Sequence, residues 1–192
     1  MDILEISYKS TKYYFIKTIK GLLAFDTGWP DTYRKYKELL KEKGYNIKDI
    51  KWVIVSHFHI DHAGLAGMFL EKGIEFIVFK NQIEEIKIME KLIKRKKMQY
   101  QDIDINKIKL MEICESRDWL NSIGIKGEVL ITDCHSKDSI SLILDNGVVF
   151  TGDLPPESFI METDKKCMKN WKILKEKGAK NIKPAHGKEY YI

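Results

Sequence analysis

Three histidines and an aspartate fall within six consecutive residues, in the segment His57-Phe58-His59-Ile60-Asp61-His62. In extended backbone, residues two apart project to the same side. His57, His59 and Asp61 are therefore expected to face together, and His62 can turn toward them where a helix begins. Imidazole nitrogens and carboxylate oxygens bind zinc-like cations at about 2.0–2.2 Å. Without a cation these groups would crowd one another, so the segment predicts a metal site.

The other two of the five histidines, and one further aspartate, each follow a predicted strand. His135 comes after a strand at 128–132, Asp153 ends a hairpin at 139–151, and His186 follows a strand at 181–183. Rigid sheet edges that present side chains from loops are a common way to assemble a site. We therefore expect these three side chains to join the cluster around His57.

The elements that must position these residues can be predicted from periodicity and turn signals. Two or three antiparallel strands are expected within residues 3–25, and buried strands at 51–56 and 74–79. Asn146-Gly147 is a strong hairpin signal between the strands at 139–144 and 148–151. Helices are expected at about 31–43, 63–72, 81–93, 117–123 and 165–177. This order favours an α+β fold in which two packed sheets carry helices on their outer faces.

Length and composition place these elements in one domain spanning residues 1–192, with 44% hydrophobic and 32% charged residues. No apolar run is long enough to cross a bilayer, and no secretory signal is visible, so we expect a cytoplasmic protein without a membrane partner. The cysteines, Cys114, Cys134 and Cys167, are odd in number and form no CxxC pair. They are expected to be thiols rather than a disulfide framework, with Cys134 packed and inert.

The net charge of +5 comes almost entirely from lysine, since the only arginines are Arg34, Arg95 and Arg117. Phosphates and base edges are recognised best by the planar guanidinium fork. The lysines are thus interpreted as a solvated surface, and a nucleic-acid partner is not expected. A small-molecule substrate is expected instead, and the oligomeric state is left open.

Five motifs occur in a fixed order from about residue 20 to residue 187: FDTG with Asp26, HFHIDH, HSKDS with His135, TGD with Asp153, and PAHG with His186. In this combination the chain resembles the metallo-β-lactamase superfamily. The resemblance implies an αββα four-layer sandwich with two metal ions. One ion would be held by His57, His59 and His135, and the other by Asp61, His62 and His186. Asp153 would bridge both ions.

The resemblance also gives Asp26 the role of orienting a ligand histidine through its other ring nitrogen. Ser139, like Ser136, is interpreted as a hydrogen-bonding group of the loop behind the ligands. The resemblance favours zinc as the metal, although imidazole and carboxylate also suit iron and manganese. One departure is local: many members have Pro-Gly before the third-motif histidine, where this chain has Asp133-Cys134.

The position of Asp153 narrows the expected activity. The best-known zinc β-lactamases carry cysteine there, whereas members resembling glyoxalase II, ribonuclease Z and lactonases carry aspartate. Glyoxalase II itself is disfavoured, because the helical extension that binds its thioester is missing after Gly187. The leading hypothesis is an enzyme in which a metal-bridging hydroxide attacks a small ester, thioester or lactone, while Asp61 orients the nucleophile or accepts its proton.

Three alternatives stay open from the sequence. A phosphodiesterase or nuclease resembling ribonuclease Z would need a lysine-lined cleft and would bind substrate with steep salt dependence. A mononuclear-iron oxidoreductase resembling persulfide dioxygenases would use only His57, His135 and Asp153. A non-catalytic metal-binding scaffold is disfavoured by the complete ligand set. The residues that contact the substrate cannot be named from the sequence.

Overall fold

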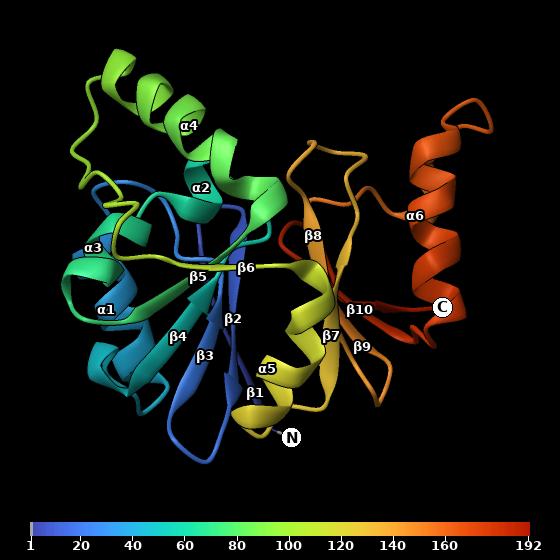
Figure 1. The fold of residues 1–192 in the computed structure, drawn as a ribbon, viewed down its shortest axis with the longest axis horizontal. Helices are drawn as coiled ribbons and strands as arrows, with labels where there is room; N and C mark the ends of the chain where they lie inside the picture. The colour runs from blue at the N-terminus through green and yellow to red at the C-terminus, as the bar shows by residue number, and fades with distance from the viewer. Residues whose placement is uncertain (1) are drawn as a thin grey trace.

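Two β-sheets packed against each other form the centre of the computed structural model, which describes residues 2–192 (Figure 1). The first sheet has the strand order β1-β2-β3-β4-β5-β6 and the second has the order β11-β10-β9-β8-β7. The strands of the first sheet are β1 (Ile3–Tyr8), β2 (Thr11–Lys17), β3 (Leu22–Phe25), β4 (Ile50–Ile54), β5 (Glu75–Phe79) and β6 (Lys109–Met111). Those of the second are β7 (Gly127–Ile131), β8 (Ile140–Leu144), β9 (Val148–Gly152), β10 (Asn181–Pro184) and β11 (Tyr190–Tyr191).

The pairing within each sheet changes from antiparallel to parallel. β1, β2 and β3 are antiparallel neighbours, whereas β3, β4, β5 and β6 run parallel. In the second sheet, β7, β8 and β9 are antiparallel, β10 joins β9 in parallel, and β11 pairs with β10 antiparallel. β3 and β8 are buried along their whole length, as expected for apolar strands covered on both faces. The loops after β4, β9 and β10 carry candidate ligands, and the sheets bring these loops together.

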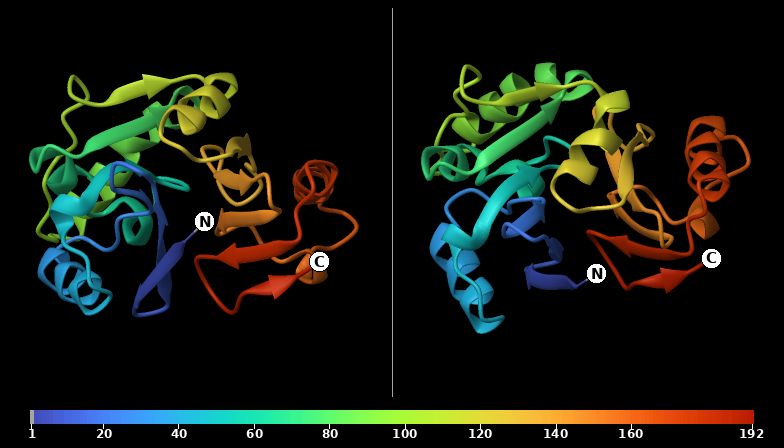
Figure 2. Two further views of the ribbon diagram at one scale, coloured as in Figure 1. Left: turned by 90° about the horizontal axis from the view of Figure 1, so that it is seen from below. Right: turned by 60° about the horizontal axis from the view of Figure 1, so that its bottom comes forward.

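Helices cover both outer faces, so the layer order is helix, sheet, sheet, helix (Figure 1, Figure 2). Helices α1 to α4 lie over the first sheet and α6 over the second, while α5 contacts β7. The α-helices are α1 (Tyr33–Glu42), α2 (Ile60–Ala63), α3 (Ala66–Glu71), α4 (Ile83–Arg95), α5 (Ser116–Ser122) and α6 (Lys165–Glu176). Short 3₁₀ turns are η1 (Ile47–Asp49), η2 (Lys80–Gln82), η3 (Ile113–Glu115) and η4 (Glu157–Phe159). The αββα sandwich predicted from the sequence is confirmed.

An aromatic layer joins the two sheets. Phe150 of the second sheet packs between Tyr14 and Phe25 of the first, with ring centroids 5.1 and 5.7 Å away. All three side chains are fully buried, and such aromatic pairs contribute about 0.5–1.5 kcal/mol beyond their area burial. The Tyr14 hydroxyl donates to the carbonyl oxygen of Pro184 at 2.8 Å. This bond fixes the end of β10 two residues before His186.

The helix predicted at about 63–72 is divided into α2 and α3. In a continuous helix the carbonyl oxygen of His62 would accept a hydrogen bond from the backbone nitrogen of Ala66. It accepts instead from Thr27. Its distances are 2.7 Å to the Thr27 backbone nitrogen and 2.9 Å to the Thr27 hydroxyl. The interruption therefore ties His62 to the loop after β3.

One expectation about the cysteines is wrong. Cys134 and Cys167 form a disulfide, with Cα atoms 5.1 Å apart, and only Cys114 is a free and exposed thiol. The two residues are separated by 33 positions in the sequence, and they meet because α6 packs on the loop that precedes His135. The cysteine usage consequently no longer argues for a reducing compartment.

Within residues 2–192, the structure has no helix with both the length and the apolar character that a membrane crossing requires.

Candidate metal centre

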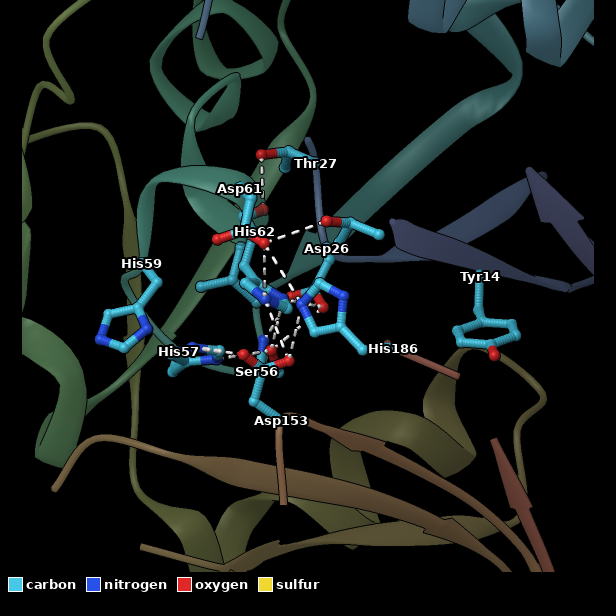
Figure 3. Close-up of polar contacts among 12 residues, drawn as sticks. Tyr14, Asp26, Thr27, Ser56, His57, His59, Asp61, His62, Asp153 and His186 are labelled. Atoms are coloured by element: carbon cyan, nitrogen blue, oxygen red, sulfur yellow. Dashed lines mark hydrogen bonds and ion pairs between the residues drawn. The ribbon is translucent and has the colours of Figure 1, made fainter. Parts of the chain in front are cut away.

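Four of the predicted ligands form a first cluster: His57, His59, His135 and Asp153. Figure 3 labels His57, His59 and Asp153 of this cluster. One potential ligand atom from each residue lies within 4.8 Å of the others. Nε2 of His135 is 3.2 Å from Nδ1 of His59, and the His57 ring centroid is 4.3 Å from that of His59 and 4.8 Å from that of His135. His57 and His59 thus face together as predicted, whereas Asp61, predicted on the same side, lies in α2 and belongs to the other group. His135 comes from the loop after β7 in the second sheet.

The remaining predicted ligands, Asp61, His62 and His186, form a second cluster. Oδ2 of Asp61 lies 3.5 Å from Nε2 of His62 and 3.3 Å from Nε2 of His186. His62 is completely buried, whereas the side chain of His186 is 38% exposed. Because His59, His135 and His186 are exposed or partly exposed, whereas His57 and His62 are buried, the site opens to solvent on the side of those three histidines.

Asp153 lies between the clusters. Its Oδ1 is 3.2 Å from Nε2 of His62 and 3.3 Å from Nε2 of His186. Its Oδ2 is 3.7 Å from Nε2 of His57 and 3.5 Å from Nε2 of His135. Each carboxylate oxygen therefore faces the imidazoles of a different cluster, which is the arrangement a bridging ligand requires.

Asp26 and Ser56 orient the two buried histidines. Oδ2 of Asp26 accepts a hydrogen bond from Nδ1 of His62 at 2.9 Å, and both the backbone nitrogen and the hydroxyl of Ser56 donate to the Asp26 carboxylate. The Ser56 hydroxyl also lies 3.0 Å from Nδ1 of His57. Because the Ser56 hydroxyl already donates a hydrogen bond to Asp26, its oxygen is free to accept a hydrogen bond from Nδ1 of His57. In this network Nε2 of each histidine is the atom that faces the cluster.

Gly152 permits this close arrangement. Its φ is +55°, and a Cβ atom built on it would lie 2.5 Å from Cβ and 2.6 Å from Oγ of Ser56. Left-handed backbone and the absence of a side chain are both needed here. Gly152 thus allows β9 to deliver Asp153 directly against the strand end that carries Ser56 and His57.

The loop that carries His135 is joined to the His57 segment by Asp138. Oδ2 of Asp138 accepts a hydrogen bond at 2.7 Å from the backbone nitrogen of Phe58, between two candidate ligands, and its carbonyl oxygen accepts from Gln82. Asp138 is 1% exposed. Ser139, predicted to support the ligands, contacts the Ser136 hydroxyl at 2.8 Å. Its hydroxyl therefore shapes the turn of the loop.

The turn between β1 and β2 supports the second cluster. The Thr11 hydroxyl, which is completely buried, donates to Oδ2 of Asp61 at 3.0 Å. The carbonyl oxygen of Ser10 accepts from Nδ1 of His186 at 2.8 Å, which directs Nε2 of that ring inward. A further backbone bond joins Lys12 to Ala185 at 2.9 Å. One turn near the N-terminus thus orients two candidate ligands from distant parts of the chain.

The buried groups of the site differ in protonation. Burial lowers the pKa of His57 well below its ordinary value, and the surrounding histidines lower it further. Burial would raise the pKa of Asp153, but His62 and the other nearby histidines outweigh burial and lower this pKa. Burial would likewise lower the pKa of His62, but Asp26 and Asp153 outweigh it and raise this pKa to about 10. In the cation-free site His57 is therefore neutral, Asp153 is ionised and His62 is protonated, so a cation that binds here must displace the proton of His62.

A family model described as the metallo-beta-lactamase superfamily matches residues 9–186. The chain belongs to the metallo-beta-lactamase superfamily. The match contains all seven candidate ligands of this metallo-beta-lactamase-fold protein, and it begins two residues before Thr11.

Solved structures share the same fold. The metallo-beta-lactamase family protein TTHA1429 from Thermus thermophilus is 18% identical, with 98% of this chain and 74% of that chain covered and a TM-score of 0.74. TTHA1623, in a di-iron-bound form, is 16% identical, with coverage of 100% and 94% and a TM-score of 0.71. The metallo-beta-lactamase GOB-18 from Elizabethkingia meningoseptica is 18% identical, with coverage of 92% and 70% and a TM-score of 0.68. At these identities the likeness shows the fold.

The donor set of this superfamily member fits a divalent cation. Nε2 of His57, Nε2 of His62 and Oδ1 of Asp153 are buried and have no hydrogen-bond partner among the described residues. Each unpaired buried polar atom costs about 1–3 kcal/mol, and all three belong to the two clusters. Two cations, one in each cluster, would pair with these atoms once His62 has lost its proton.

Sequence reasoning missed four residues that support the ligands in this fold: Ser10, Thr11, Ser56 and Asp138. Ser56 directly precedes the first ligand, which is a local signal. Thr11 and Asp138 are separated from their partners by 50 and 80 positions, so no local pattern identifies them. The loop Asp133-Cys134 differs from the Pro-Gly of many members through its disulfide to α6.

A Thr11→Val variant is expected to bind a divalent cation at the second cluster about 10-fold more weakly, since partners of metal ligands typically contribute 10–100-fold. Valine keeps the volume of threonine but cannot donate to Asp61. Titration of the metal-free protein with Co²⁺, followed by visible absorption, measures the change. Thr11→Ser should restore tight binding. Thr18→Val, which removes a hydroxyl bonded to Gly21 in a distant turn, is the matched control; equal weakening in both valine variants would contradict the assignment.

Proposed function

We propose that this protein is a metal-dependent hydrolase that binds two divalent cations, with zinc as the expected metal. His57, His59 and His135 would hold one cation, and Asp61, His62 and His186 the other, with Asp153 shared between them. The observation that carries the proposal is the position of Asp153, whose two oxygens face different clusters at 3.2–3.7 Å. A carboxylate that bound one ion alone would not need its two oxygens to face different groups of histidines.

Cations bound at these residues would supply Lewis acidity, polarising a carbonyl or phosphoryl oxygen and lowering the pKa of a coordinated water. The chain's own groups do the rest. Thr11 holds Oδ2 of Asp61, which leaves Oδ1 to orient the attacking water and accept its proton. Asp26 and Ser56 hold His62 and His57 in fixed ring orientations, so the site is organised before the substrate arrives.

A small ester, thioester or lactone is the substrate class we propose. The aspartate at position 153, in place of cysteine, supports a role other than β-lactam hydrolysis. The three arginines lie outside both clusters: Arg34 and Arg95 belong to α1 and α4, and Arg117 pairs with Glu128 and Asp145. Neither cluster therefore includes an arginine guanidinium that could bind a phosphate group. A carbonyl substrate needs only the polarising cations and a proton acceptor.

The test begins with elemental analysis of the purified protein, together with ester, thioester, lactone, phosphodiester and β-lactam substrates. Two zinc ions per chain and turnover of an ester-type substrate are expected. Iron is the alternative metal, because one structure of the same fold, TTHA1623, is in a di-iron-bound form. Hydrolysis of the phosphodiester alone would replace the proposed substrate class. A chain with full metal content and no turnover of any carbonyl substrate would refute the proposal.

A His59→Ala variant should lose metal content and ester hydrolysis together, because this change removes one imidazole of the first cluster. His59 is exposed, so the fold should be unaffected. Thermal unfolding of the metal-free variant should therefore match that of the metal-free parent, which serves as the control. Unchanged turnover in the variant would show that His59 is not a ligand.

A further inference from the structure

Helix α6 is attached to the loop that carries His135. The disulfide joins Cys134 of the loop to Cys167 of the helix. The backbone nitrogen of Cys134 donates to Oδ1 of Asn170 at 3.0 Å, and Nζ of Lys166 lies 2.9 Å from Oδ2 of Asp133. Asn170 is 3% exposed. Three kinds of contact, covalent, hydrogen-bonded and ionic, therefore hold two consecutive residues of the loop.

These two residues directly precede a candidate ligand. Neither Asp133 nor Cys134 restricts its own backbone as a proline would. In this chain the restraint comes from another element of the fold. On its other side, the loop is held by Asp138 through Phe58. His135 thus lies between one anchor on α6 and one on the His57 segment.

The second cluster is held differently. Its residues are oriented by Thr11, Asp26 and Ser10, which belong to the first sheet and its turns. None of these contacts involves α6. A change at the disulfide should therefore reach His135 and leave Asp61, His62 and His186 in place, which provides an internal comparison within one molecule.

We propose that α6 positions His135 through the Cys134–Cys167 disulfide and Asn170, so that the redox state of this disulfide sets the cation affinity of the first cluster. The inference rests on the proposed metal site. When a dithiol or a phosphine reduces the S–S bond, two electrons and two protons convert it to two thiols, and the reductant becomes a disulfide or a phosphine oxide. The loop then gains conformational freedom that cation binding must remove again. Binding at the first cluster weakens, while binding at the second does not.

The experiment compares oxidised and reduced forms of the full chain. A water-soluble phosphine is the reductant, because added thiols would compete for the cation; it is oxidised to the phosphine oxide with oxygen from water. After its removal under argon, the metal-free protein is titrated with Co²⁺ and followed by visible absorption. In the reduced form we expect the Co²⁺ binding constant of the first cluster to fall by about 10–100-fold, the range typical for partners of metal ligands. The binding constant of the second cluster should not change. Reoxidation should restore the binding constant of the first cluster.

Three variants separate positioning from other effects. Cys114→Ser removes the free thiol and should respond to the phosphine as the parent does. The double variant Cys134→Ser with Cys167→Ser should show the weakened constant without reduction, and it excludes new thiolate ligands as the cause. Asn170→Ala, with the disulfide intact, should weaken the same constant and leave the other unchanged. Thermal unfolding of the metal-free forms checks that each variant is folded.

Two cations bound with the same affinities in the oxidised and reduced forms would overturn this inference and leave the proposed function standing. Two cations bound in the oxidised form, with no hydrolysis of any substrate, would instead contradict the proposed function and leave the positioning intact. Equal weakening of both constants would show that the disulfide acts on the fold as a whole, which would also overturn the inference.

Discussion

An Asp153→Asn variant is expected to retain at most one cation per chain and to lose hydrolysis by about 10³-fold, since a cation's contribution to transition-state stabilisation is several kcal/mol and each 1.36 kcal/mol is tenfold in rate. The amide has the shape of the carboxylate but only one oxygen. It can face the His57 side or the His62 side, and its nitrogen is a donor that repels a cation. The loss should therefore affect both clusters, unlike any other single substitution among the ligands.

Metal content by elemental analysis and ester turnover at saturating Zn²⁺ measure this effect. Asp145→Asn is the matched control, because Asp145 is an exposed carboxylate in the turn between β8 and β9 whose partner is Arg117. It should retain full metal content and activity. An Asp153→Asn protein that still binds two cations with parental affinity would show that this carboxylate does not bridge the clusters.

A Gly152→Ala substitution is expected to destabilise the protein by about 3 kcal/mol, combining a left-handed backbone penalty with overpacking against Ser56. For a chain of this size the midpoint of thermal unfolding should fall by roughly 6–12 °C, at about 2–4 °C per kcal/mol. The added methyl group must displace Ser56, whose Oγ would lie 2.6 Å away. Because Ser56 orients His57 and Asp26, cation affinity should fall as well.

Gly178→Ala is the control for the backbone term. Its φ is +84°, but nothing lies within 4 Å of a Cβ atom built there. It should cost only about 1 kcal/mol, the penalty for left-handed backbone alone. Calorimetry of both variants, with and without bound cation, separates the two terms. Similar midpoints for the two variants would mean that the contact between Gly152 and Ser56 is not under steric constraint.

Local patterns were sufficient to locate the candidate ligands and most helices and strands. His57 and His59 face together as expected for alternate residues, whereas Asp61, expected on the same side, lies in α2 and joins the second cluster. Asp153 and His186 could be located because strand signals precede them. The αββα architecture followed from the order of those elements. The division between α2 and α3 was not predictable, because it depends on a carbonyl of His62 that bonds to Thr27 across the fold.

Supporting contacts between distant segments could not be predicted. Thr11 is one hydroxyl residue among many, and its partner Asp61 is reached only when the first turn folds onto the His57 segment. Cys134 was interpreted as a packed thiol, since cysteine count and spacing carry no information about how α6 packs. Ser139, expected to be a hydrogen-bonding group of the loop behind the ligands, does bond within that loop, but its partner Ser136 could not be named from the sequence. Proximity in sequence does not decide which atom a side chain meets.

Each cluster draws side chains from both sheets: His57, His59, Asp61 and His62 come from the first half of the chain, and His135, Asp153 and His186 from the second. An ion bound in either cluster would consequently link the two halves of the chain. Because such an ion would bind only the folded form, the two halves should separate less often as the free ion concentration rises. At low ion concentration the aromatic layer around Phe150, which lies between the sheets, should therefore be exposed to solvent more often. Faster amide hydrogen exchange in β8 and β9 would measure this exposure.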